Sequence, residues 1–318
     1  MTPFAYLDDG QAVRQVEAAE AAAGSGRARL VWMHLDGFDA DTPAFLCNAL
    51  GLSDLVASAL TAAETRPRCE PMGDGALINL RGLSLKDEDE ADPLISIRVW
   101  TERGRIVSVA RYTMRAIPIL RAAMAAGRVR DPGDFVALLA DAITEDLDPD
   151  VADLGDKLDD CEVMLDGRQA FALRRTVAAA RSKAIEYRRF VAPQRQALER
   201  LAALACDWLE EDDRLELREA ADRFARMTEE LESIRERAAL MSEQITDLRA
   251  ELMDTRSLWL SVVALIFLPL TFLTGLLGMN VKGIPYAEEP WAFWGVVGVC
   301  LALATATLIY FTRSRWLR

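Results

Sequence analysis

The sequence has very little of what a tight transition-metal site requires. It contains a single histidine, His34, and five cysteines that lie far apart without a C-x-x-C pair. Structural zinc cages need clustered Cys and His ligands, so the composition excludes a site of that kind. Scattered cysteines are typical of reduced thiols in a cytosolic domain. His34 lies in the apolar stretch LVWMHLDG, and we expect it to be a core histidine with its hydrogen bonds satisfied.

Motifs of nucleotide binding and catalysis are also missing. There is no Walker loop, no G-x-G-x-x-G, no nucleophile elbow and no H-E-x-x-H, so we expect neither an enzyme with catalytic residues nor a bound cofactor. The formal net charge of −13 argues against nucleic acid as a partner, because nucleic-acid binding needs a basic surface. An acidic body attracts cations instead, although solubility alone also accounts for the charge.

Charged residues are absent from two long runs, 258–277 and 291–311. Each is about as long as the ~20 apolar residues that a helix needs to cross a bilayer. The N-terminus has neither a basic start nor an apolar core, so we expect no signal peptide and a cytoplasmic body. Arginines precede the first run and follow the second, whereas Lys282, Glu288 and Glu289 lie between them. The positive-inside rule then places both termini in the cytoplasm.

The first 130 residues have a mixed α/β pattern. Short β-branched stretches bounded by Gly, Asp and Pro predict strands, which we place at 30–35, 76–80, 95–100 and 106–110. Segments of helical composition occupy 42–50, 53–63 and 114–126.

Strand signals vanish beyond Pro132. We predict long helices at 134–166, at 170–206 and from 210 into the first apolar run, with a kink or break at Pro193. The sequence therefore predicts three domains. They are a cytoplasmic α/β domain at 1–130, a cytoplasmic long-helix stalk at 131–257, and a transmembrane domain at 258–318 with helices at 258–277 and 291–311 and an outer loop at 278–290.

The third long helix carries a heptad seam. Its apolar residues alternate in steps of three and four: Phe224, Met227, Leu231, Ile234, Ala238, Met241, Ile245, Leu248 and Leu252. This spacing is typical of coiled coils. A helix over 210–277 is on the order of 100 Å long at 1.5 Å per residue and needs packing partners. We expect the two preceding helices to cover part of the seam and self-association to cover the rest.

Inside the first apolar run the seam continues with small and hydroxylated residues. This small-residue stripe consists of Ser257, Ser261, Ala264, Leu268, Thr271 and Gly275. One interpretation is a face for close helix packing. The other is a water-filled path, in which hydroxyl and carbonyl oxygens replace part of a cation's hydration shell. Two spans cannot enclose a pore, so the second interpretation requires a symmetric ring of chains, with an apolar constriction at Leu268.

A row of acidic residues provides a second candidate cation site. These residues recur every three or four positions on one predicted helix face: Asp146, Asp150, Asp153, Asp156 and Asp160. Carboxylates suit Mg²⁺ or Zn²⁺, so a regulatory site between subunits is one interpretation. A solvated helix face is the other, and we favour it.

The first apolar run ends in TFLTGLLGMN, which places Gly278, Met279 and Asn280 at its outer end. A Gly-Met-Asn motif between two C-terminal spans, after a long charged helix, resembles the CorA family of divalent metal transporters along the whole chain. The resemblance implies a funnel-shaped homopentamer in the bacterial inner membrane, in contact with membrane lipids. It also implies that the small-residue stripe lines the pore and that Asn280 presents its side-chain carbonyl to a hydrated ion.

The residues after the motif depart from the magnesium members, which usually continue with Met-Pro-Glu-Leu. Here Asn280 is followed by VKGIPYAEEPW, and its Gly-Ile-Pro and acidic pair, Glu288 and Glu289, resemble the ZntB zinc-transporter branch. The resemblance thus implies Zn²⁺ uptake, which that branch is reported to couple to protons, although Lys282 is unexpected at the mouth of a cation path. The alternatives are a Mg²⁺ or Co²⁺ channel of the same architecture and a membrane-anchored coiled-coil scaffold that conducts nothing.

Overall fold

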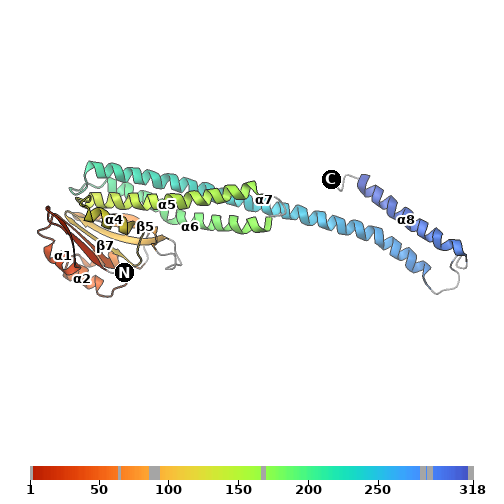
Figure 1. The fold of residues 1–318 in the computed structure, drawn as a ribbon, viewed down its shortest axis with the longest axis horizontal. Coiled ribbons are helices and arrows are strands. Elements are labelled where there is room, and N and C mark those ends of the chain that lie inside the picture. Colours follow the sequence, from red (N-terminus) through yellow and green to blue (C-terminus); the bar gives the residue numbers. More distant parts are fainter. Residues whose placement is uncertain are drawn as a thin grey trace. The chain divides into compact units, whose positions relative to one another are not determined.

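The computed structural model describes residues 3–63, 66–85, 94–165, 170–279, 284 and 289–313. The chain forms two compact units. The first combines Met1–Leu165 with Phe171–Ser242, and the second combines Asp166–Ala170 with Glu243–Arg318. The first unit contains a sheet and a helical bundle, and the second contains two apolar helices (Figure 1).

A mixed seven-stranded sheet with the order β2-β1-β3-β7-β6-β5-β4 is the centre of the first unit. The strands are β1 (Phe4–Asp8), β2 (Val13–Val16), β3 (Leu30–Asp36), β4 (Arg68–Met72), β5 (Gly75–Leu83), β6 (Leu94–Glu102) and β7 (Arg105–Ala110). The β3–β7 pair is parallel and the other neighbouring pairs are antiparallel. The four predicted strands are confirmed as β3, β5, β6 and β7, whereas β1, β2 and β4 were not anticipated.

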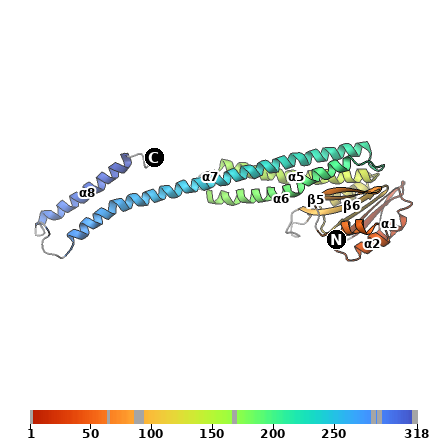
Figure 2. The same cartoon turned by 180° about the vertical axis from the view of Figure 1, so that it is seen from behind.

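Short helices cover both faces of this sheet. They are α1 (Ala18–Gly24), α2 (Thr42–Asn48), α3 (Asp54–Thr61) and α4 (Ala116–Ala125). Strand alternation directs Val31 and Met33 into an apolar core with α1, α2 and α3. It directs Trp32 and His34 to the opposite face, where α4 and the first long helix lie (Figures 1 and 2). The helices predicted at 42–50, 53–63 and 114–126 are confirmed.

Three long helices follow: α5 (Pro132–Val163), α6 (Ala170–Ala202) and α7 (Glu211–Leu277). Helix α5 begins at Asp131, whose carboxylate accepts the Asp134 backbone N–H at 2.9 Å, as expected of an N-cap. The predicted break at Pro193 is absent, because α6 continues through this residue. Its neighbours Phe190, Val191 and Leu198 are buried, so packing maintains the helix despite the missing N–H donor.

The heptad seam is buried within the chain over most of its length. Helices α5, α6 and the first part of α7 lie side by side (Figures 1 and 2), and Phe224 through Met241 of the seam are at most 2% exposed. Ion pairs join α7 to both partners, for example Arg223 to Asp141 at 2.7 Å and Arg188 to Glu232 at 2.7 Å. The expectation that the preceding helices cover part of the seam is confirmed.

In the second unit, the C-terminal part of α7 lies beside α8 (Pro290–Arg313). Among the described residues, both helices contain segments long and apolar enough to cross a membrane. The least exposed side chains on this part of α7 recur every three or four residues and are Leu258, Val262, Ile266, Leu270, Leu273 and Leu277. We call these residues the less exposed side of α7.

Candidate functional site

The small-residue stripe remains uncovered on α7. Every member is exposed, and Leu268 reaches 76%. At 3.6 residues per turn, the stripe and the less exposed side lie on roughly opposite sides of the helix. Bulky Leu, Val and Ile residues therefore make up the less exposed side, and the small residues are not buried by the described part of the chain.

Hydroxyl groups along the stripe have a defined orientation. The Ser261 hydroxyl donates to the Ser257 carbonyl at 2.9 Å, and the Thr271 hydroxyl donates to the Phe267 carbonyl at 2.8 Å. Because each hydroxyl hydrogen is bonded inside the helix, the oxygen lone pairs are left for an external donor. Water around a cation therefore meets acceptors on this face.

The C-terminal end of α7 is described as far as Met279. The Gly278 N–H donates to the Thr274 carbonyl at 2.9 Å, and a Cβ at Gly278 would lie 3.0 Å from the same oxygen. Glycine thus fits this tight end, and Met279 is exposed. Asn280 and Glu288 lie outside the described residues. Glu289 is exposed directly before α8, where its backbone carbonyl accepts the Ala292 N–H at 3.1 Å.

The predicted acidic row lies on α5 and is partly neutralised by the same chain. Asp146 pairs with Arg115 at 3.5 Å, and Asp150 accepts the Tyr187 hydroxyl at 2.8 Å. Asp153 pairs with Lys157 on the next turn.

Three members of the row, Asp153, Asp156 and Asp160, are exposed. In the described part of the chain, none of the five belongs to a group of three close metal-ligating side chains. The arrangement favours a solvated, ion-paired helix face.

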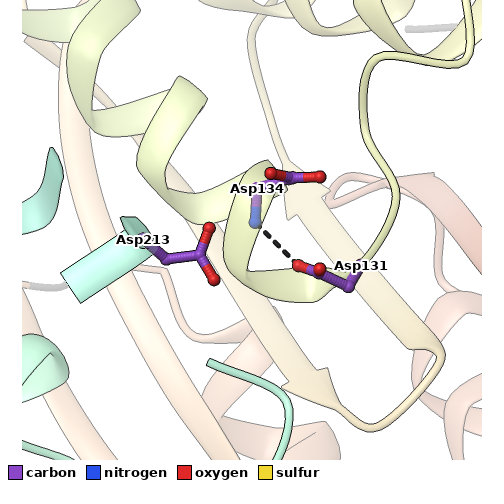
Figure 3. A group of neighbouring side chains, drawn as sticks. All are labelled: Asp131, Asp134 and Asp213. Atoms are coloured by element: carbon purple, nitrogen blue, oxygen red, sulfur yellow. Dashed lines mark hydrogen bonds between the residues drawn. The ribbon is translucent and has the colours of Figure 1, made fainter. Parts of the chain in front are cut away.

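A different carboxylate group, which sequence spacing did not indicate, lies at two helix N-termini. Ligand atoms of Asp131, Asp134 and Asp213 lie within 4.8 Å of one another (Figure 3). Asp134 accepts the Arg130 backbone N–H at 2.8 Å and its guanidinium at 3.0 Å. Asp213 accepts the Glu210 N–H at 2.8 Å, at the start of α7. Negative charge at helix N-termini is favourable, and each carboxylate therefore has a structural role.

Burial gives this carboxylate group unusual proton affinity. Asp213 is 4% exposed, and desolvation raises its pKa to about 6, with added repulsion from Asp131 and Asp134. Burial also raises the pKa of Asp131. A Cβ at Gly133 would lie 2.1 Å from Asp213 Oδ2, so a larger residue here would displace the Asp213 carboxylate. Three carboxylates suit a hard divalent cation, but their present partners already account for them.

Comparison with known proteins identifies the architecture. A family model described as CorA-like Mg²⁺ transporter protein matches residues 27–313. The chain belongs to the CorA family. Among curated CorA relatives, one named zinc transport protein ZntB, from Pectobacterium atrosepticum, is 33% identical over 90% of this chain and 88% of its own length. Another, the divalent cation transporter CmaX of Pseudomonas aeruginosa, is 32% identical over 90% of this chain and 87% of its own.

Solved structures agree with the CorA assignment. Full-length CmaX superimposes with a TM-score of 0.78 at 30% identity, covering 99% of this chain and 98% of that one. The CorA magnesium transporter of Methanocaldococcus jannaschii gives 0.79 at 19% identity, with 99% of each chain covered, and this likeness supports the fold alone. The family resemblance read from Gly278, Met279 and Asn280 is thereby confirmed.

Proposed function

We propose that the chain transports divalent metal cations across the bacterial inner membrane and prefers Zn²⁺. Membership of the CorA family and a 33% identical relative named as a zinc transport protein support this proposal. Five copies form a funnel-shaped homopentamer, in which the small-residue stripe of α7 lines the pore. Both termini lie in the cytoplasm, in keeping with the arginines that flank the apolar runs.

The observation that carries this proposal is the separation of two faces on α7. Leu, Val and Ile residues form the less exposed side, whereas the opposite face presents exposed small residues and hydroxyl oxygens. A helix in contact with lipid on that face would gain nothing from serine and threonine. A helix that faces water at the centre of a ring uses their lone pairs to solvate a cation.

The chemistry of the pore suits an ion that keeps most of its water. Neither apolar run contains a charged residue, so the ion meets only dipoles and the apolar Leu268 constriction. Mg²⁺ and Zn²⁺ exchange water for weak neutral oxygens reluctantly, and a hydrated ion avoids that cost. At the mouth, Gly278, Met279 and Asn280 receive the ion. Glu288 and Glu289 carry two negative charges against the one positive charge of Lys282, so the mouth attracts cations. A ring of subunits multiplies this excess of negative charge.

The domain arrangement follows from the same proposal. Residues 1–130 form a cytoplasmic α/β domain, 131–257 form the stalk, and 258–318 form the membrane domain. The chain is a transporter without enzymatic activity, so the driving force is the ion gradient, the membrane potential or protons. The spans contain no Asp, Glu, His, Lys or Arg that could act as a proton carrier.

A Mg²⁺ or Co²⁺ channel of the same architecture is the second candidate. The matching family model carries a Mg²⁺ transporter description, and neutral oxygen ligands along the stripe do not distinguish these ions by softness. Zn²⁺ remains favoured because of the loop sequence after Asn280 and the named zinc relatives.

Ion flux into proteoliposomes tests the proposal. Full-length protein is reconstituted, and the entry of Zn²⁺, Mg²⁺ and Co²⁺ is compared with and without a pH gradient. We expect Zn²⁺ to enter fastest. Absence of flux for all three ions with wild-type protein would refute transport, and faster Mg²⁺ or Co²⁺ entry would favour the second candidate.

A matched pair of variants tests the path. Thr271→Val removes a stripe hydroxyl and keeps its shape, and we expect zinc flux to fall about tenfold, a change worth 1.4 kcal/mol. Thr305→Val is the control, because the Thr305 hydroxyl on α8 is also exposed and donates to the Leu301 carbonyl at 2.7 Å. Equal flux in both variants would contradict a path along the stripe.

A further inference from the structure

The α/β domain contains a pocket that the proposed transport does not use. A cavity of about 520 Å³ opens between the sheet and α4. It lies beside His34, near the carboxyl end of the parallel strand β3, and beside the first turn of α4, where Ile117 and Pro118 line it. Ligands of α/β proteins characteristically bind outside the carboxyl ends of parallel strands, so the location is suited to binding.

A buried polar atom in the pocket wall lacks a partner. His34 is fully buried, and its Nδ1 lies 2.7 Å from Ser108 Oγ. Its Nε2 has no hydrogen-bond partner among the described residues. The expectation of a fully satisfied core histidine is therefore wrong for one ring nitrogen. Burial lowers the His34 pKa to about 3, so the imidazole is neutral at physiological pH.

The neighbours of His34 define which nitrogen carries the proton. Ser108 Oγ accepts the Trp32 Nε1–H at 2.8 Å. Its own hydrogen has two acceptors in reach, His34 Nδ1 at 2.7 Å and the Met33 carbonyl at 3.4 Å. The contacts allow either tautomer, and the shorter distance favours the arrangement in which this hydrogen goes to Nδ1 and the ring proton is on Nε2. A buried N–H donor without an acceptor costs about 1–3 kcal/mol, a cost that a ligand acceptor removes.

The remaining charge in the pocket also favours an anion. No carboxylate is among the described residues that line the pocket, although Asp36, two positions beyond His34 on β3, acts electrostatically on the imidazole. Arg121 lines the pocket with its guanidinium carbon 4.5 Å from the Phe4 ring centroid, and no ion pair is recorded for it within the described residues. The His34 ring stacks on the same Phe4 ring at 4.9 Å, and both donors line the pocket. The N-terminus of α4 adds partial positive charge.

We propose that this pocket binds a small organic carboxylate. Its oxygens accept hydrogen bonds from His34 Nε2 and Arg121, while an apolar body contacts Phe4 and Ile117. Bidentate contact with a guanidinium is the geometry that carboxylates prefer. The α/β domain is thereby a ligand-binding module in addition to the proposed transport.

The single histidine permits a direct test by nuclear magnetic resonance. Full-length protein without a histidine tag is labelled with ¹⁵N-histidine in detergent micelles and gives one pair of imidazole nitrogen signals. We expect the Nε2-protonated tautomer and a saturable shift of the Nε2 signal with benzoate as the probe. Benzyl alcohol, a neutral molecule of similar shape, should need at least about tenfold higher concentration, since it lacks the charge-assisted contacts.

Variants of Arg121 complete the test. Arg121→Gln should weaken benzoate binding about tenfold, and Arg121→Lys should retain part of the affinity. Arg128→Gln, which removes an exposed arginine just beyond α4, should bind as wild type does. An Nδ1-protonated ring, no saturable shift with benzoate, or equal binding by wild type and Arg121→Gln would overturn the proposal.

Discussion

Replacing Asp213 by asparagine removes a charge that the fold holds in a buried position at the start of α7. The folded-state pKa of about 6 lies above the ordinary value of 3.8, so the folded protein binds an extra proton between these values. The free energy of unfolding therefore falls as pH rises through this window. At 1.36 kcal/mol per pH unit the loss reaches about 3 kcal/mol above pH 6, and about half of it falls between pH 5 and 7.5.

Asparagine keeps the shape and the acceptor for the Glu210 N–H but does not titrate. We expect the difference in melting temperature between Asp213→Asn and wild type to increase by about 3–6 °C in favour of the variant from pH 5 to pH 7.5. Differential scanning fluorimetry of the full-length protein in detergent measures this difference. Asp212→Asn, an exposed neighbour, is the control for the loss of one charge. A difference that stays constant with pH would refute the reasoning.

Three further changes test other parts of the structure. Gly133→Ala places a Cβ 2.1 Å from Asp213 Oδ2, and we expect it to destabilise the fold by about 1–3 kcal/mol. At Gly155 on the same helix the nearest atom is 3.8 Å from the added Cβ, so Gly155→Ala should stabilise the fold by up to about 1 kcal/mol. Thermal unfolding measures both changes. Phe224→Ala empties a fully buried seam position and should lower the free energy of unfolding by about 3–5 kcal/mol. The melting temperature should then fall by on the order of 10 °C. An unchanged melting temperature would contradict the intrachain packing of the seam. Glu289→Gln should slow zinc entry into proteoliposomes at low salt. It should have little effect near 1 M salt, where the screening length is about 3 Å. An effect that does not depend on salt would contradict long-range attraction of the ion by this carboxylate.

Much of the fold is encoded in local patterns. The β-branched runs of β3, β5, β6 and β7 and the long helices have periods that a sequence displays directly. By contrast, β4 reads RCEPM, with Arg, Glu and Pro that disfavour strands. Its place in the sheet depends on pairing with β5, as at Cys69 and Ile78. Such a strand is defined by tertiary contacts and has no strong signal of its own.

Some of the candidate sites could likewise be predicted from local sequence patterns, and others could not. The small-residue stripe was found from sequence because a helix fixes which residues share a face, and α7 continues from Ser257 through Gly275. The carboxylate group of Asp131, Asp134 and Asp213 joins two helix starts that are far apart in sequence, so no local spacing reveals it. The free Nε2 of His34 depends on Ser108, a neighbour on another strand.

Chemical modification of the stripe during zinc flux tests the central claim most directly. In a Cys300→Ala background, Thr271→Cys and Thr305→Cys proteins are reconstituted and treated with a cationic methanethiosulfonate reagent. A pore lined by the stripe predicts that modification at Thr271→Cys blocks zinc entry and that modification at Thr305→Cys on α8 leaves it unchanged. Unimpaired zinc flux after complete modification at Thr271→Cys would contradict the account.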